Sequence, residues 1–514
     1  MTHPRTPVLV GVAQFTDRDS APVADRPRAG SPLDLLARVG AAALADAGGT
    51  SIALDTVAVV RLFADSSPAF ASPFGHYTNL PRALARRLGA NPRTALYGPV
   101  GGNTPQMLVN LMAERIARGE ADAVLIAGCE ALRTQAHAVK AGIALDWSDD
   151  SGGNLDGSAP DTLGPETLLV SRHEIAHGIA LPVNVYPLFE SAVAARYGGS
   201  PAAHRARIGA LMARFTEVAA ANPHAALPVA RSAEELTAAT EANRMIASPY
   251  TKYLVANMFV DQAAAVVMMS TAAADAAGVP QHKRVYLHGC ADTHEPILVS
   301  DRSDYAASPS IRAGAAHALD HAGIGVADLG PIELYSCFPV AVEIAADMIG
   351  LAHDDPRGLT LTGGLPYFGG PGNNYSMHGI GEMVARCRSD ARAYGLVFAN
   401  GGYLTKSSFG VYSGRAVPGE WSRTSPAVYQ AEIDCLPAPA FTETPAGPAT
   451  VEALTVVHDR GAPAFAIVVG RQAADGARFL ANTSDGLVEL AEGGMVGRGF
   501  EVEAEERVNK ATFG

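Results

Sequence analysis

Side chains able to move a proton stand at the end of one apolar stretch of the chain. Residues 332–334 lead directly into Tyr335, Ser336 and Cys337, and Pro339 opens a helix-period segment. This order predicts a strand that runs out into a loop, and ligands bind at the carboxyl ends of strands in α/β sheets. A phenol there can donate to a developing enolate or take a proton from a β-hydroxyl. A thiol can act as acid, base or nucleophile when its pKa is lowered. The alternatives are a space-filling ring and an inert buried thiol.

A glycine-rich loop, residues 369–374, opens a second helix further along the chain. Backbone N–H groups of Gly369 and Gly370, together with the Asn373 amide, could hold an oxyanion or a thioester carbonyl. The same glycines are also what a tight turn needs. His378 lies in the helix that follows and could act on a substrate only if it faces the same pocket, whereas a lone helical histidine is more often structural.

A third candidate segment joins a strand to a helix near residue 100. Residues 96–105 read as a strand feeding a glycine-rich loop, and a buried strand follows the next helix, which is the order of a βαβ unit with a parallel sheet. Gly102, Asn103 and Thr104 end the loop. Thr104 is either a plain helix cap or, with Asn103, part of a substrate site.

The bulk composition is that of an ordinary globular chain. It has 514 residues, of which 48% are hydrophobic and 18% charged, so two or three domains are expected rather than disorder. The net charge of −13 argues against a nucleic-acid partner, because such binding depends on neutralising phosphates.

The five cysteines give no metal or disulfide pattern. They stand singly, without a CxxC pair, so we expect no zinc or other metal site and no disulfide framework. The N-terminus lacks the apolar core of a signal peptide, and no apolar run approaches the roughly 20 residues of a membrane span. We therefore expect a cytoplasmic protein without a membrane partner.

A weak internal repeat predicts a duplicated core. Residues 43–48 resemble residues 318–323, and the strands that follow lie at the same offset. Each half would then run strand, helix, strand, helix, strand in α/β order. We assign residues 1–275 to the first half and 276–416 to the second.

Three further segments complete the predicted plan. Residues 132–250 are richer in polar and turn residues, with helices near 187–197 and 202–221, which indicates an inserted loop domain over one face of the sheet. Residues 417–447 carry many prolines, which marks a linker. From 448 to 514 the pattern alternates as in strands, as expected of a small β-barrel of about five strands.

Four motifs in sequence order resemble the thiolase superfamily. Residues 119–130 are similar to the thiolase strand that begins G-x-x-D and ends G-x-E, and residues 261–265 resemble its D-G-A-A-A strand. Residues 335–338 resemble the H-D-C-F motif of the sterol-carrier-type thiolases, and residues 363–371 resemble their G-G-L…G-H-P motif. The resemblance covers roughly residues 5–415. It implies the duplicated five-layer α/β thiolase fold of two βαβαβαββ halves.

The departures from this family bear on the chemistry. Counting from residues 119–130 places the family's nucleophilic cysteine at Gly102, and the G-H-P histidine falls at Gly370. Tyr335 stands where an Asn or His of the first oxyanion hole is expected, whereas Cys337 matches the acid/base cysteine of the sterol-carrier type. A glycine cannot take up an acyl group, so thiolysis through a cysteine adduct is not expected.

The tail resembles the OB-fold domains that accompany thiolase-superfamily proteins as partner subunits. The whole pattern looks closest to actinobacterial-type thiolase-like proteins with an additional C-terminal domain. Some thiolase-like aldolases that cleave steroid side-chain thioesters pair with such a subunit and use tyrosines in place of a cysteine. The tail from Pro426 to Gly514 has 13 acidic and 6 basic residues, which argues against single-strand nucleic-acid binding.

The resemblance implies an enzyme of lipid metabolism that acts on an acyl-CoA thioester, with coenzyme A as part of the substrate and no other cofactor. It would form or break a C–C bond next to the thioester, and retro-aldol cleavage of a β-hydroxyacyl-CoA is the most concrete version. Tyr335, Cys337 or His378 would move the proton, and backbone donors near Gly102 and Gly370 would hold the carbonyl. The alternative is an inactive homologue that binds acyl-CoA or a partner protein. Thiolase cores usually dimerise, so a homodimer is an option that the insertion or the tail can block.

Overall fold

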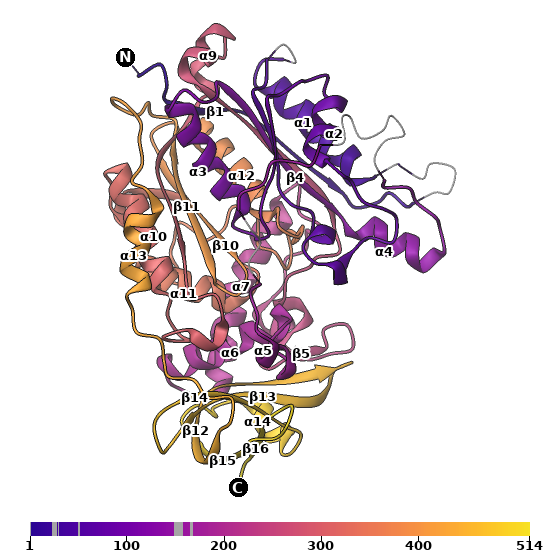
Figure 1. The fold of residues 1–514 in the computed structure, drawn as a ribbon, viewed down its shortest axis with the longest axis vertical. Coiled ribbons are helices and arrows are strands. Elements are labelled where there is room, and N and C mark those ends of the chain that lie inside the picture. The colour runs from indigo at the N-terminus through magenta and orange to yellow at the C-terminus, as the bar shows by residue number, and fades with distance from the viewer. Residues whose placement is uncertain (1, 23–27, 29, 50–51, 149–157, 165–167) are drawn as a thin grey trace.

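The core of the computed structural model is one nine-stranded sheet, in the order β3-β2-β4-β7-β1-β8-β11-β10-β9 (Figure 1). The structure describes residues 2–22, 28, 30–49, 52–148, 158–164 and 168–514, so residues 149–157 and 165–167 of the predicted insertion lie outside the described part. The strands of the core sheet are β1 (Pro7–Asp17), β2 (Thr56–Val59), β3 (Thr94–Tyr97), β4 (Ala123–Ala131), β7 (Asp261–Ser270), β8 (Val285–His294), β9 (Leu329–Leu334), β10 (Tyr394–Gly401) and β11 (Lys406–Ser413).

The strand order confirms the predicted duplication. Strands β7, β4 and β2 follow β1 on one side, and β11, β10 and β9 follow β8 on the other. The halves meet where Val8 pairs with Tyr286 and Leu9 with Val285. Among the described residues only β3 has no counterpart in the second half. The helices of the two halves are α1 (Pro32–Asp46), α2 (Leu80–Arg87), α3 (Thr104–Ala117), α9 (Thr271–Ala276), α10 (Pro309–Ala322), α11 (Pro339–Ile349) and α12 (Tyr375–Ser389).

The strands are buried on both faces, as apolar strands covered by helices must be. In β4 the side chains of Val124 and Ile126 belong to the same hydrophobic cluster as α3 and α12. The alternate residues Leu125 and Ala127 belong to the cluster of α1 and α2. Helices α3 and α12 therefore form a central layer, and α1–α2 and α10–α11 form the outer layers of a five-layer thiolase-type arrangement.

A pair of glycines repeats the same helix–strand contact in both halves. A Cβ on Gly11 would lie less than 3.0 Å from the carbonyl oxygen of Ala43, and a Cβ on Gly289 would lie equally close to that of Ala318. Both alanines belong to the repeated segments 43–48 and 318–323. The repeat seen in the sequence is thus the surface on which α1 and α10 approach their strands.

The insertion supplies most of the helices between the core and the C-terminal domain (Figure 1). Its elements are α4 (Leu132–Ala141), α5 (Arg172–Ala176), α6 (Pro182–Tyr197), α7 (Pro201–Ala221), α8 (Ala233–Thr237), β5 (Met245–Ala247) and β6 (Tyr250–Thr251). Strand β5 pairs with the C-terminal domain through Ala247 and Val457. The insertion therefore extends the sheet of that domain.

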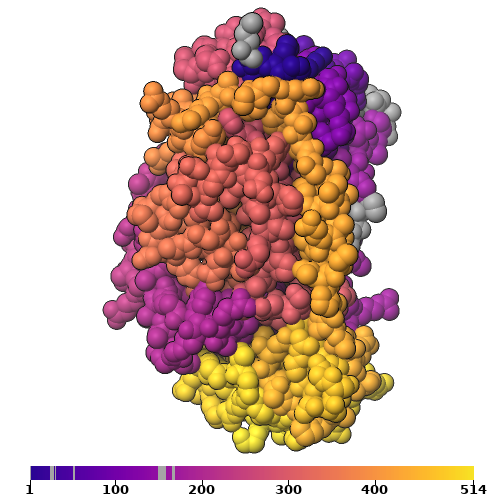
Figure 2. Space-filling model, turned by 90° about the vertical axis from the view of Figure 1, so that its left-hand side faces the viewer, coloured from indigo at the N-terminus to yellow at the C-terminus, as the bar shows by residue number. Residues whose placement is uncertain are grey.

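The C-terminal domain is a closed barrel of five strands, because β12 pairs with both β13 and β15. Its elements are β12 (Ala446–Asp459), β13 (Ala462–Gln472), β14 (Arg478–Thr483), α14 (Leu487–Glu492), β15 (Gly499–Glu503) and β16 (Lys510–Thr512). Figure 2 shows this domain in yellow at one end of the molecule, beside the purple segments of the insertion.

The proline-rich segment 417–447 is bound to the core over part of its length. It contains α13 (Pro426–Asp434), whose Tyr429 hydroxyl accepts a hydrogen bond from the Asp292 N–H at 3.0 Å and whose Gln430 accepts one from the His294 N–H at 2.8 Å. Proline at the first turn is compatible with a helix, so the prolines here mark a helix start as well as a connection. No helix in the described part of the chain is long and apolar enough to cross a membrane.

Candidate active site

The predicted site lies at the carboxyl ends of two strands, as the sequence indicates. Strand β9 ends at Leu334 and α11 begins at Pro339, so residues 335–338 form the loop between them. Residues 101–103 precede α3, and β10 ends nearby at Gly401. The fold brings these three chain segments into contact.

Tyr335 fills the space beside Gly102. A Cβ on Gly102 would lie 2.7 Å from Cζ of Tyr335 and 2.6 Å from the carbonyl oxygen of Asn400, distances that real Cβ atoms do not show. Only glycine fits at residue 102 next to this ring. The Tyr335 side chain is 7% exposed, and burial raises the pKa of its phenol, so the hydroxyl is a hydrogen-bond donor at neutral pH.

Three hydrogen-bond donors near Gly102 have no partner among the described residues. Within the described residues the Tyr335 hydroxyl makes no hydrogen bond, and the N–H groups of Gly102 and Asn103 have no acceptor. Both N–H groups stand at the N-terminus of the 14-residue helix α3, where the helix dipole favours negative charge. The Ser376 hydroxyl donates to the Gly102 carbonyl at 2.8 Å and fixes the loop. The arrangement can receive a developing oxyanion.

Cys337 is held as a neutral thiol. Burial raises its pKa to about 12, and the side chains of Tyr186 and Asn400 are its hydrogen-bond neighbours. The Asn400 amide donates to the Tyr186 hydroxyl at 2.9 Å, and that hydroxyl donates to the Gly402 carbonyl at 2.9 Å. A thiol in this state can donate a proton but is a poor nucleophile.

The buried carboxyl group of Glu333 is linked to the ring of Tyr335 through Tyr375. Glu333 is 1% exposed and accepts hydrogen bonds from the N–H groups and hydroxyls of segment 360–362 and from the Tyr375 hydroxyl at 2.6 Å. The Tyr375 ring meets the Tyr335 ring edge-on at 5.4 Å. Burial raises the pKa of Glu333. Glu333 therefore fixes Tyr375, which in turn orients Tyr335.

His378 is placed apart from this group. It is fully buried, its Nδ1 lies 2.8 Å from the Gln14 amide oxygen, and its ring meets Phe368 at 5.0 Å. Burial, with a smaller effect of His224, lowers its pKa to about 3. The structure gives His378 no contact with Tyr335 or Gly102, because Phe368 and Tyr375 stand between them.

In the glycine-rich loop 369–374, two of the three predicted substrate-binding residues, Gly370 and Asn373, are hydrogen-bonded to other parts of the chain. The Gly370 N–H donates to the Asn257 carbonyl at 2.8 Å, so it is not free for an oxyanion. The Asn373 amide oxygen accepts from the Gly101 N–H at 3.0 Å and ties this loop to the 101–103 loop. Gly369 has φ of +119° and faces Gln262, a position that only glycine tolerates.

The two residues after Gly102 differ in their polar contacts. The Thr104 hydroxyl donates to the Pro99 carbonyl at 2.9 Å. It is not a helix cap, because Thr104 is the first residue of α3 and the N-cap is Asn103, which makes no side-chain cap hydrogen bond. The Asn103 side-chain amide donates to the Ser408 hydroxyl at 3.2 Å, while its buried side-chain oxygen has no partner among the described residues. Asn103 thus retains a free acceptor beside the site.

Comparison with known proteins shows which family the chain belongs to. The sequence model named "Thiolase-like protein type 1 additional C-terminal domain" matches residues 429–507. A crystal structure of a monomeric SCP2-thiolase like protein type 1 from Mycobacterium smegmatis shares 40% sequence identity, covers 100% of both chains and superposes with a TM-score of 0.84. The chain belongs to the SCP2-thiolase-like protein type 1 family.

More distant structures share the fold of the core. The Ltp2-ChsH2(DUF35) aldolase (19% identity, TM-score 0.57) and human mitochondrial 3-ketoacyl-CoA thiolase in complex with CoA (17% identity, TM-score 0.56) each match 80% of this chain and 99% of their own. A search of curated proteins gives no significant match. The family and its thiolase-like fold with an added barrel are thereby established.

Several residues of this type 1 protein's site are not evident from the sequence. Tyr186 lies in the insertion, almost 150 residues before Tyr335, and no local pattern connects them. Two other residues could have been predicted from the sequence. Asn400 is followed by two glycines at the end of a buried strand, and Glu333 is a carboxylate inside an apolar strand, which needs a hydrogen-bond partner.

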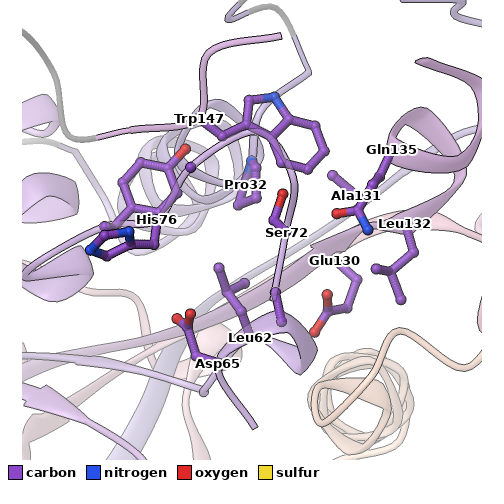
Figure 3. Close-up of a pocket in the computed structure, with 13 residues that line it drawn as sticks. Pro32, Leu62, Asp65, Ser72, His76, Glu130, Ala131, Leu132, Gln135 and Trp147 are labelled. Carbon is purple, nitrogen blue, oxygen red and sulfur yellow. The ribbon is translucent and has the colours of Figure 1, made fainter. Parts of the chain in front are cut away.

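Glu130 lines a small separate pocket at the end of β4 (Figure 3). Burial, and to a lesser degree Asp65, raises the pKa of Glu130 to about 8, while the Phe63 N–H donates to its carboxyl group at 2.6 Å. The pocket leaves about 20 Å³ for water, enough for a single molecule. It is too small for an acyl thioester.

Proposed function

We propose that this type 1 protein is a thiolase-like enzyme that forms or breaks the C–C bond next to an acyl-CoA thioester without a cysteine adduct. Retro-aldol cleavage of a β-hydroxyacyl-CoA is the reaction we favour. The observation that supports it is the unpaired Tyr335 hydroxyl beside Gly102, where no nucleophile is present.

The first requirement of this reaction is a site for the enolate oxygen. Cleavage of the Cα–Cβ bond leaves its electron pair on the thioester unit, and the negative charge develops on the carbonyl oxygen. The N–H groups of Gly102 and Asn103 at the start of α3 would receive that charge, since neither has an acceptor in the part of the chain that the structure describes. Preorganised donors of this kind are usually the largest electrostatic contribution to catalysis.

The second requirement is a proton balance. The β-hydroxyl must lose a proton as the carbonyl product forms, and the α-carbon of the enolate must gain one. Tyr335 can do both without becoming a phenolate, because its hydroxyl gives one proton and receives another. This relay suits a phenol whose pKa is raised by burial. Cys337, also neutral, would be the second donor.

The test is turnover of a panel of β-hydroxyacyl-CoA and β-ketoacyl-CoA thioesters by the full chain. We expect release of an aldehyde or ketone together with the shortened acyl-CoA from at least one β-hydroxyacyl-CoA. A Tyr335→Phe variant should lose at least about 100-fold in kcat, the scale of one general acid–base group. Full activity in that variant would refute the assignment of Tyr335.

A binding protein without turnover is the second candidate. Two observations favour it: Tyr335 and Cys337 are each only 7% exposed, and the Gly370 N–H is already bonded to Asn257. Calorimetric titration with coenzyme A and acyl-CoA separates the candidates. Binding without product formation over the whole panel would support this second function.

We also propose that the chain acts as a monomer. Strand β3 is an edge strand of the core sheet, and exposed edges are where chains pair. Here the Tyr97 N–H donates to the Asp161 carbonyl at 2.8 Å and the Ala95 N–H donates to the Asp161 carboxylate at 3.1 Å. The covered edge supports a monomer over the homodimer considered from the sequence. Light scattering of the purified chain tests this.

A further inference from the structure

A cavity of about 270 Å³ lies between the insertion and the C-terminal domain, away from the Tyr335 site. Its lining comes from α6, from the loop and first turn of α7, and from the Ser248-Pro249 peptide. The C-terminal domain contributes β12, the end of α14 and the loop after it. Small-molecule sites occur preferentially at such domain interfaces, in mostly apolar cavities with a few polar groups. We call it the interdomain cavity.

Glu190 and His204 form the polar floor of the interdomain cavity. With Glu343 they offer three possible ligand atoms within 4.8 Å of one another. Arg207 donates to Nδ1 of His204 at 2.8 Å, so the ring proton sits on Nε2 and points to Glu190. A metal-bound histidine instead presents a lone pair to the ion and donates from its other nitrogen. We therefore assign this group as a hydrogen-bonded floor and not as an ion site.

The charged carboxylate of the floor is already occupied by protein donors. One Glu190 oxygen accepts from His204 and the other from the Tyr250 hydroxyl. Burial, followed by the neighbouring Glu190 charge, raises the pKa of Glu343 well above its usual range, so this carboxyl group is neutral. Glu492 lies on the exposed rim. Both oxygens of the Glu190 carboxylate are thus already hydrogen-bonded within the protein.

Free donors, by contrast, converge on the interdomain cavity. The Ser248 hydroxyl is buried and has no hydrogen-bond partner among the described residues. The 21-residue helix α7 begins at the cavity with Ser200 as its N-cap. Within the described part of the chain, the N–H groups of Gly199 and Ser200 have no acceptor. Arg205 adds one positive charge, although its guanidinium also donates to the Glu492 carbonyl at 3.4 Å. These groups suit an anionic head group.

The remaining lining is apolar except for Ser191, whose hydroxyl already donates to the Leu188 carbonyl. Its larger apolar side chains come from both domains and are Pro201, Pro249, Leu454, Leu490, Met495 and Val496. Removal of an aliphatic chain from water against these side chains is favourable by roughly 25 cal/mol per Å² of apolar surface. The cavity thus combines one donor-rich end with apolar walls.

We propose that the interdomain cavity binds a medium-chain aliphatic carboxylate, with its head at Arg205 and the start of α7 and its tail along Leu454 and Met495. One cation and one helix N-terminus match a single negative charge, which favours a carboxylate over a doubly charged phosphate monoester. The site is separate from the one proposed for the acyl-CoA thioester and does not depend on that function.

The test is calorimetric titration of the full chain with octanoate, octanol and octylamine. We expect saturable binding of octanoate, accompanied by a higher melting temperature, and weaker binding of the other two. Equal binding of all three would mean an apolar slot without head-group recognition and would overturn the proposal. Absence of octanoate binding at millimolar concentration would overturn it as well.

Variants locate the binding. Arg205→Gln should weaken octanoate binding about 10-fold or more, the effect of one charge-assisted hydrogen bond. Arg214→Gln, which removes the same charge from an exposed position later in α7, should leave it unchanged. Ala194→Phe, which fills the cavity from α6, should abolish it while circular dichroism remains that of the parent. Unaltered octanoate affinity in both Arg205→Gln and Ala194→Phe would place the ligand elsewhere and refute the site.

Discussion

The ring of Tyr335 occupies the space that any side chain at residue 102 would need. A Cβ there would lie 2.7 Å from Cζ of Tyr335. The Tyr335 ring can therefore take this position only when residue 102 is glycine. The two largest departures from the thiolase motifs are therefore coupled. A cysteine at residue 102 is incompatible with a tyrosine at residue 335 in this backbone.

Substituting Gly102→Ala tests this coupling directly. The added methyl group meets the Tyr335 ring and the Asn400 carbonyl, and overpacking of this kind costs about 1–3 kcal/mol of stability. The midpoint of urea unfolding should fall accordingly. Gly325→Ala is the matched control, because its nearest neighbour would be the far end of Asp328 at 3.7 Å.

A double variant shows which neighbour causes the loss. Gly102→Ala with Tyr335→Ala removes the ring but keeps the Asn400 carbonyl, so it should recover part of the stability lost on adding the methyl group. If Gly102→Ala costs the same in the presence and absence of the Tyr335 ring, the coupling between the two residues is absent.

The Glu333–Tyr375 contact predicts an effect on both stability and turnover. Tyr375→Phe removes one of several donors to the buried Glu333 carboxyl group, and we expect a loss of about 1 kcal/mol. Because Tyr375 orients Tyr335, kcat for the proposed cleavage should fall with little change in KM. Steady-state kinetics and urea unfolding measure the two effects.

Tyr412→Phe is the control for that experiment. Tyr412 is equally buried and donates to the Gln106 amide oxygen at 2.8 Å, but it does not contact Tyr335. It should cost similar stability and leave kcat unchanged. An equal loss of kcat in both variants would mean that general destabilisation, and not the orientation of Tyr335, lowers the rate.

The sequence predicts the duplicated fold well because helix–strand packing is locally encoded. Residues 43–48 and 318–323 resemble one another since each must let its helix approach a glycine in a neighbouring strand. The carboxyl-end position of Tyr335 also follows from local pattern. These features depend on neighbours in the chain, which a single sequence displays.

The polar contacts of the site depend on residues far apart, and the sequence does not display those. Tyr186 comes from the insertion and meets Cys337 and Asn400 only in the folded chain. Whether His378 faces the pocket also depends on which side of α12 is covered. In the structure Gln14 and Phe368 cover it, a result that helical periodicity alone does not supply.

Arg478 anchors the C-terminal domain to the core. Its fully buried guanidinium pairs with Glu452 and donates to the carbonyls of Ser300 and Arg302. Arg478→Met removes the donor to the Ser300 and Arg302 carbonyls, while Glu452 keeps its ion pair with Arg471. Each buried acceptor left unpaired costs about 1–3 kcal/mol. Thermal unfolding should show a much lower first transition, with the barrel and the core no longer melting together.

Arg498→Met is the control for Arg478. Arg498 pairs with Glu489 within the barrel at 34% and 66% exposure of the two side chains, so its loss should be nearly neutral, as for most surface ion pairs. Comparable melting curves for the two variants would argue against an anchoring role of Arg478.

His378 predicts how stability depends on pH. Burial lowers its pKa to about 3 in the folded chain, whereas an unfolded histidine titrates near 6.5. Below about pH 6.5 the unfolded chain therefore binds a proton that the folded chain does not, and stability falls as the pH falls. For this one group the loss approaches about 1.4 kcal/mol per pH unit until the folded pKa is reached.

Urea unfolding at pH 7, 6 and 5 measures this effect. The free energy of unfolding should depend less steeply on pH in His378→Asn than in the parent chain. His282→Asn, at an exposed position, should not alter that slope. An unchanged slope in His378→Asn would show that this histidine is not held neutral by burial.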